Sequence, residues 1–183
     1  EDGVGVNSKG ILISESDDIS ISSEGEVHLA KVLSEKDIRV NAKETVSLND
    51  LVQANGQLNL NGNGIELNSA DVVASEAMLM AEDDIVIDDS KLGVSQNLVV
   101  QSSGDFDVSD SELLSKGDLN IDANSLRQSG QMQSNGTIII NVNESVQNNG
   151  EILGGDNVSI LANGDVEQTD GSTIQSNGDV LID

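Results

Sequence analysis

The chain lacks several residue types that folded domains of its size normally contain. Its 183 residues include no Cys, Pro, Trp or Tyr, and Phe106 is the only Phe. Without Cys the chain has no disulfides and no thiol chemistry. Since aromatic side chains fill broad cores, we predict a narrow core in which Leu, Ile and Val meet. The apolar content of 36% is nevertheless too high for a disordered acidic chain.

Basic residues are also scarce. The chain has 33 acidic and 8 basic residues, a formal net charge of -25. Such a surface repels phosphate backbones and anionic membranes, so we predict no nucleic-acid partner. No apolar run approaches eighteen residues, so we predict no membrane insertion. The sequence shows no signal peptide and no initiator Met, and we expect it to be cut from a longer chain.

Short apolar–polar–apolar triplets recur along the chain at steps of 19 to 22 residues. Residues two positions apart lie on the same face of a strand, so each triplet predicts a short strand with both apolar side chains pointing inward. The predicted inward pairs are Ile19/Ile21, Ile38/Val40, Leu58/Leu60, Met78/Met80, Leu98/Val100, Leu119/Ile121, Ile138/Ile140, Val158/Ile160 and Val180/Ile182.

Two further series of apolar residues follow the triplets in each repeat. Gly, Asn, Asp and Ser separate the three segments, so each repeat predicts three short strands and three turns, with no room for a helix. One series is Val27, Val46, Ile65, Ile85, Phe106, Leu126, Val146 and Val166. The other is Leu33, Val52, Val72, Leu92, Leu113, Met132, Ile152 and Ile174.

Three strands and three turns in about 20 residues describe one coil of a parallel β-helix. Each coil hydrogen-bonds to the next, about 4.8 Å away, so that equivalent residues stack in columns. The predicted fold class is all-β: a right-handed parallel β-helix (solenoid) of about nine coils. The hand follows from the preference of parallel crossovers.

The repeat changes character near residue 116. Before that point the second segment ends in an apolar residue, and afterwards it ends in Gln128, Asn148 and Gln168. We therefore predict one continuous β-helix over 1–183, with looser repeats over 1–115 and regular repeats over 116–183. A turn glycine follows each of the three polar residues, and we expect positive φ at Gly130, Gly150 and Gly171.

The later repeats share a recognisable pattern. It stands as Gly-Asp-Leu-Asn-Ile at 117–121, Ser-Asn-Gly at 134–136 and Val-Gln-Asn-Asn-Gly-Glu-Ile at 146–152. From about residue 115 onward this pattern resembles the haemagglutinin repeats of filamentous-haemagglutinin-type two-partner-secretion exoproteins. The earlier repeats are in phase with it but match more loosely.

The resemblance implies a very large bacterial protein that is secreted through a dedicated outer-membrane transporter and held at the cell surface. Its family includes adhesins, haemolysins and effectors of contact-dependent growth inhibition, in which the repeats form a shaft. The family's amino-terminal secretion domain carries Asn-Pro motifs, and the absence of Pro leads us to expect internal shaft. The implied partners are the transporter during export and a receptor on a host or neighbouring cell.

A carbohydrate-active enzyme is the main alternative, since many right-handed β-helices are polysaccharide lyases or hydrolases. The candidate carboxylate pairs are Asp17/Asp18, Asp83/Asp84 and Asp88/Asp89. The coils are too tight for substrate-binding loops and offer no aromatic platform for sugars. We therefore predict no catalytic residues and no enzyme. A receptor-binding segment of the rod is a further alternative.

Metal binding is also weighed against simpler interpretations. The calcium-binding nonapeptide Gly-Gly-x-Gly-x-Asp is absent. The aspartates around 85–87 flank one strand on opposite faces, which does not make a calcium cage. His28, the only histidine, should point outward between Val27 and Leu29 without metal-binding partners. We predict no metal site and no cofactor.

Two surface features complete the sequence-based predictions. Sequons for N-glycosylation occur at Asn135, Asn143 and Asn157, although an Asn-rich repeat also produces them by chance. An outward apolar column suited to docking a partner is predicted at Leu79, Val99, Ile139 and Leu181.

Overall fold

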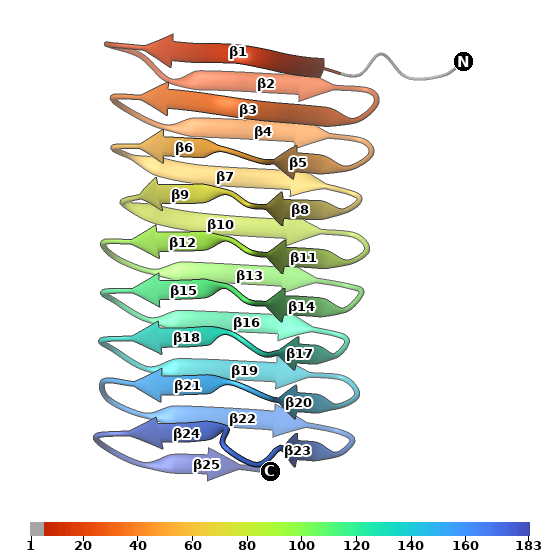
Figure 1. Ribbon diagram of the computed structural model, residues 1–183, viewed down its shortest axis with the longest axis vertical. Helices are drawn as coiled ribbons and strands as arrows, with labels where there is room; N and C mark the ends of the chain where they lie inside the picture. The colour runs from red at the N-terminus through yellow and green to blue at the C-terminus, as the bar shows by residue number, and fades with distance from the viewer. Residues whose placement is uncertain (1–5) are drawn as a thin grey trace.

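Residues 6–183 of the computed structural model form 25 strands and no helix (Figure 1). The strands stack as about nine coils in one straight column, with equivalent strands paired in parallel from coil to coil. The predicted all-β parallel β-helix is therefore confirmed. Residues 6–183 contain no helix long and apolar enough to cross a membrane.

One sheet has nine strands, one from each coil, ordered along the column as they are along the chain. Its strands alternate buried and outward residues, as the apolar–polar–apolar triplets predict. They are β2 (Ile19–Ser23), β4 (Ile38–Ala42), β7 (Gln57–Gly62), β10 (Glu76–Ala81), β13 (Leu98–Ser102), β16 (Leu119–Ala123), β19 (Ile138–Val142), β22 (Val158–Ala162) and β25 (Val180–Ile182).

The other sheet has 16 strands and contains the two remaining sides of the coils. One side comprises β5 (Val46–Leu48), β8 (Ile65–Asn68), β11 (Ile85–Asp88), β14 (Phe106–Ser109), β17 (Leu126–Gln128), β20 (Val146–Asn148) and β23 (Val166–Gln168). The next comprises β6 (Leu51–Ala54), β9 (Asp71–Ala74), β12 (Lys91–Val94), β15 (Glu112–Ser115), β18 (Gln131–Ser134), β21 (Glu151–Gly154) and β24 (Thr173–Ser176).

The first coils join these two sides into single strands, β1 (Val6–Ser14) and β3 (Val27–Ser34). Strand β3 pairs with both β5 and β6, which is why the two sides count as one sheet. Later coils bend at residues such as Asn49 and Asp50, whereas β3 has Ala30 and Lys31 there. Without turn residues the strand continues, so these coils depart from the predicted three strands.

The core is a narrow column of aliphatic side chains with Phe106 as its one aromatic residue. Phe106 is fully buried and stacks between Ile85 and Leu126. The predicted second series forms this column throughout. Strand pairing is continuous across residue 116, because β13 pairs with β16 and β15 with β18.

The prediction for β10 is wrong by one residue. Leu79 points inward and is fully buried, while Met78 and Met80 point outward. Only Ser75 separates β9 from β10, whereas Asn55 and Gly56 separate β6 from β7. The shorter turn shifts the strand by one position, and a one-residue shift exchanges its two faces.

The third predicted series is wrong at its first member. Val32, not Leu33, is fully buried and pairs with Val52. Leu33 pairs with Gln53 and points outward. The sequence Val-Leu offers an apolar residue in either phase, and the continuous strand β3 decides between them.

The turn glycines serve a different purpose from the one predicted. Gly171 has the expected positive φ, 88°, but Gly130 and Gly150 do not. A Cβ on Gly130 would lie 2.1 Å from the backbone oxygen of Ser111, and one on Gly150 equally close to that of Gly130. Two of the three glycines are therefore required by close approach between coils rather than by backbone conformation.

Glycines that stand directly before a strand, as in the Gly-Asp pair at 117–118, have a similar explanation. The N–H of Asp118 donates to Asn97 Oδ1 in the preceding coil at 2.9 Å, and that of Thr137 donates to Asp118 Oδ1 at 2.8 Å. A Cβ on Gly117 would lie 2.3 Å from Asn97 Oδ1. Glycine thus leaves room for the Asn or Asp that caps the strand of the coil before it.

Candidate functional site

The carboxylate pair Asp17/Asp18 is held by cations from the next coil. Lys36 Nζ lies 3.4 Å from Asp17 Oδ1, and Arg39 Nη1 lies 2.6 Å from Asp18 Oδ2. Arg39 also contacts Asp37 through Nη2. The hydrogen bond from Arg39 lowers the pKa of Asp18, and the same bond raises the pKa of Arg39. A carboxylate stabilised as the anion is poorly suited to act as a general acid.

The other two pairs are engaged in stacking the coils. Asp84 Oδ1 accepts the N–H of Asp105 at 2.7 Å. Asp88 accepts the hydroxyl of Ser109, and Asp89 that of Ser69. These contacts join the carboxylates of Asp84, Asp88 and Asp89 to neighbouring coils. Asp83/Asp84 and Asp88/Asp89 lie at the two ends of β11 in one coil, and Asp17/Asp18 lies in the first coils, so the structure does not bring the three pairs together.

Metal-ligating side chains do not converge anywhere within residues 6–183: no group of three or more His, Asp or Glu could hold an ion. His28 points outward, as predicted, with its side chain 43% exposed. Its Nε2 lies 2.8 Å from Glu26 Oε2. The one histidine therefore has a carboxylate neighbour, which stands two residues before it in the sequence.

An arginine cluster that sequence reasoning missed lies on the outer side of β14 and β17. Arg127 Nη1 lies 3.1 Å from both carboxylate oxygens of Asp107, and Nη2 lies 3.0 Å from Asp105 Oδ2. Partial burial raises the pKa of Asp107, while Arg127 opposes that rise. A spacing of 20 residues between opposite charges could have revealed the pair once the period was known.

The interior contains a polar ladder that replaces apolar residues from β17 on. Gln128 and Asn148 point inward and are buried, and Gln128 Nε2 donates to Asn148 Oδ1 at 2.7 Å. Asn148 Oδ1 also accepts the N–H of Gly150 at 3.1 Å. Gln128 Oε1 has no hydrogen-bond partner. Gln168, in the last coil, is exposed and donates to Ser172 O instead.

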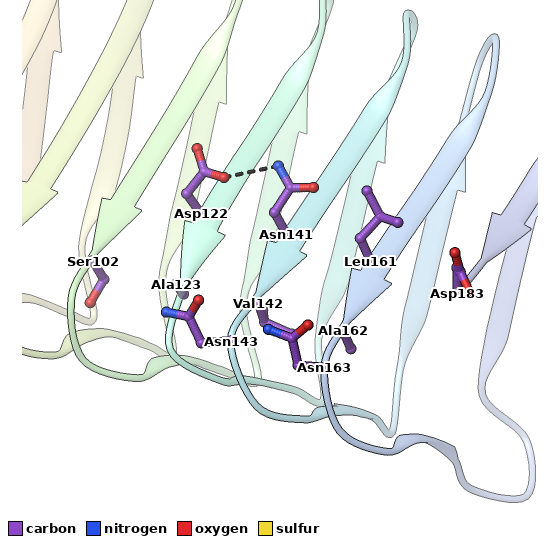
Figure 2. A pocket seen from close by; sticks show the side chains of 10 residues that line it. All are labelled: Ser102, Asp122, Ala123, Asn141, Val142, Asn143, Leu161, Ala162, Asn163 and Asp183. Atoms are coloured by element: carbon purple, nitrogen blue, oxygen red, sulfur yellow. Dashed lines mark hydrogen bonds between the residues drawn. The ribbon is translucent and has the colours of Figure 1, made fainter.

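A polar groove of about 510 Å³ follows the ends of β16, β19 and β22 (Figure 2). Asp122, Asn141 and Leu161 extend side by side from the three strands, and Asn141 Nδ2 donates to Asp122 Oδ1 at 2.9 Å. Ala123, Val142 and Ala162, the last residues of the three strands, follow them, with Asn143 and Asn163 beyond. The groove offers amides and carboxylates for hydrogen bonding, but no nucleophile paired with a base.

A second, apolar groove of about 390 Å³ lies on the 16-stranded sheet. Gly93 stands between Val73 and Leu114 in one outward column. A side chain at Gly93 would meet no atom within 4 Å, so the glycine leaves a gap in the column. Lys116 lies at its edge.

The predicted surface features are only partly found as expected. Val99, Ile139 and Leu181 point outward, but Leu79 is buried, and Met78 takes its place beside Val99. Asn135 and Asn143 of the sequons are exposed. Asn157 is exposed too, but its Oδ1 accepts the N–H of Asp179 at 2.9 Å.

No family model, curated protein or solved structure matches the chain. The geometry therefore stands on its own. Its dominant property is continuity: parallel pairing extends without a break from β2 to β25.

Proposed function

We propose that the chain is a shaft segment of a large secreted bacterial surface exoprotein, extending a binding or toxic tip away from the cell. The uninterrupted stacking of nearly identical coils supports this function most directly. Every coil uses about 20 residues to add about 4.8 Å of length. A rod of this kind converts chain length into reach, whichever activity lies at its end.

The residue contacts fit a mechanical role. The Asp, Asn and Ser side chains at the turns bond the coil before or after them, as Asp84 and Asn97 do. The interior is filled by short aliphatic columns that need only the neighbouring coil. A chain of this design, without disulfides, could cross an outer-membrane pore unfolded and add coils as it emerges.

The proposal is tested on intact cells of the source bacterium with an antibody against residues 6–183. We expect surface labelling that disappears when the gene for the cognate outer-membrane transporter is deleted, with the protein then retained inside the cell. Labelling only after permeabilisation of transporter-positive cells would contradict the proposal. Whether the shaft belongs to an adhesin or to a growth-inhibition effector is tested by mixing the same cells with target cells and scoring attachment against killing.

The enzyme alternative is tested separately. Incubation of the purified chain with acidic polysaccharides should release no new reducing ends. Turnover that survives repurification would favour a carbohydrate-active β-helix instead.

A further inference from the structure

Charged side chains avoid the outward side of the nine-stranded sheet. We call this surface the low-charge face; it consists of the two outward residues of each strand, from Ser20 and Ser22 of β2 to Ser159 and Leu161 of β22, with Leu181 of β25. On a chain with 33 acidic and 8 basic residues, three charged residues lie on the face itself: Arg39, Asp122 and, directly after β25, Asp183. Glu76 stands at its margin and accepts a hydrogen bond from Gln57 at 2.8 Å.

Two other outward columns are more highly charged, whereas the column from Gln53 of β6 to Gln175 of β24 is uncharged but lies beside one of them. The side formed by β8, β14, β17 and β23 carries Glu66, Asp107, Arg127 and Glu167 in a single column. The first outward column of the next side carries Asp71, Lys91, Glu112 and Glu151. Two copies of a rod with a net charge of -25 therefore repel each other less when the low-charge faces meet than when either charged column faces its copy.

The apolar residues of the face form two clusters. Met78, Met80 and Val99 lie together on β10 and β13. Ile139, Leu161 and Leu181 lie on β19, β22 and β25. The clusters lie on opposite sides of the midpoint between β13 and β16, and a two-fold axis there brings one apolar pair together, Met78 of the first cluster and Ile139 of the second.

We propose that the low-charge face binds a second copy of this chain, with the two rods antiparallel and the two-fold axis along the strands between β13 and β16. In this arrangement Met78 faces Ile139 of the second copy, and Val99 faces Asn120. Arg39 comes within reach of Asp183, so its charge meets an opposite one. Asp122 faces the neutral Gln101.

The available area is compatible with a weak dimer. The eight strands from β4 to β25 overlap in this arrangement, and at about 4.8 Å per strand, about five residues each and about 3.3 Å per residue they give roughly 600 Å² for each copy. Stable interfaces bury about 800 Å² for each partner, so the pairing should be reversible and dependent on concentration. The inference does not depend on the exoprotein function, because it rests on the surface alone.

The first test is sedimentation equilibrium of the chain at low and high ionic strength. Screening shortens the reach of the repulsion from about 10 Å at 0.1 M salt to about 3 Å at 1 M. We expect a monomer at 0.02 M NaCl and a monomer–dimer equilibrium at 0.5 M. A monomer at both salt concentrations would overturn the proposal. It would do so even if a neutral-polysaccharide column retarded that monomer, because the face would then bind sugar and not a second copy.

Single charges should abolish the pairing selectively. Met78→Glu and Ile139→Glu place a charge at the centre of each apolar cluster and should raise the dimer dissociation constant at least about tenfold. The matched control is Val73→Glu, which adds the same charge at an outward position, 47% exposed, on the other sheet. Circular dichroism checks that all three variants fold. Equal weakening by all three would show a general charge effect and overturn the face assignment.

Cross-linking tests the antiparallel arrangement, since the chain has no Cys. Asn59→Cys protein is mixed with Ser159→Cys protein and treated with a short bis-maleimide, because stacked sheets lie about 10 Å apart, too far for a disulfide. We expect cross-linked heterodimers of the two variants. Cross-linking of Asn59→Cys protein to itself, without heterodimers, would show parallel rods and overturn the arrangement.

Discussion

At the scale of single residues, the stacking of coils leaves no space for a side chain at some glycine positions and open space at others. Gly130 lies directly against the backbone of the preceding coil, whereas Gly93 faces open space. Both are glycines in the same sheet region, and sequence alone does not separate them. The distance between the backbones of neighbouring coils distinguishes the two positions.

Gly130→Ala should lower the free energy of unfolding by about 1–3 kcal/mol, because its Cβ would overlap the oxygen of Ser111. Gly93→Ala is the matched control and should be neutral or stabilising by up to about 1 kcal/mol. Urea denaturation followed by circular dichroism measures both. Equal effects of the two substitutions would contradict the close approach at Gly130.

The carboxyl group of Asp107 should make stability depend on pH. Because folding raises the pKa of Asp107, its charged form opposes folding, and stability falls as pH rises above the ordinary value of 3.8 and through the raised pKa. Asp107→Asn should therefore raise the melting temperature at pH 7, while the difference should vanish at pH 3. Arg127 keeps Asp105 as its partner.

The control for that measurement is Asp165→Asn, which removes the same charge at an exposed turn position. It corrects for the general benefit of reducing a net charge of -25. A gain at pH 7 no larger than that of Asp165→Asn would show that burial of Asp107 has no energetic consequence.

At the scale of strands, two features decide which side chains enter the core: the phase of each strand and the polar ladder. In β10 five consecutive apolar residues, 77–81, allow either phase, and the one-residue turn at Ser75 selects Leu79. In β17 and β20 amides enter the core because they bond to each other and to the turn backbone.

The phase of β10 is testable with two truncations. Leu79→Ala should lower the free energy of unfolding by about 2–5 kcal/mol, the usual result of emptying a buried site. Met78→Ala, at the neighbouring outward position, should change it by less than about 1 kcal/mol. Thermal and urea denaturation of both variants measure the difference. A larger loss of stability for Met78→Ala than for Leu79→Ala would show that Met78, and not Leu79, lies in the interior.

The polar ladder should respond differently at its two members. Gln128→Leu removes the unpaired Oε1 and places an apolar side chain beside buried Val108, so we expect a gain of about 1 kcal/mol. Asn148→Leu removes the acceptor of both Gln128 and Gly150 and should destabilise by about 1–3 kcal/mol. Destabilisation by Gln128→Leu of the same size would indicate that Oε1 is satisfied in solution.

At the scale of the whole molecule, repulsion between acidic surface residues opposes the stabilisation that the regular apolar core provides. The eight basic residues are paired only in part, and the net charge of -25 is distributed along the entire column. Self-repulsion favours solubility and opposes compaction at the same time. Salt should therefore stabilise the rod.

Raising NaCl from about 0.02 M to 0.5 M should raise the melting temperature by several degrees, because screening weakens repulsion between like charges. The measurement is made on both the natural chain and Ile139→Glu at low concentration, which separates screening from any gain through dimerisation. A melting temperature that falls with salt would mean that ion pairs such as Lys91–Glu112 outweigh the repulsion.

The sequence by itself determined the parallel β-helix, the 20-residue period and most of the inward columns. It could do so because strand alternation and turn residues act locally and recur about nine times. The tertiary structure decided the phase of β10, the inward position of Val32, the reason for Gly130 and Gly150, and the pairing of Arg127 with Asp107. These features depend on how closely two coils approach and on how the length of a turn shifts the next strand. Both are determined only when the coils stack.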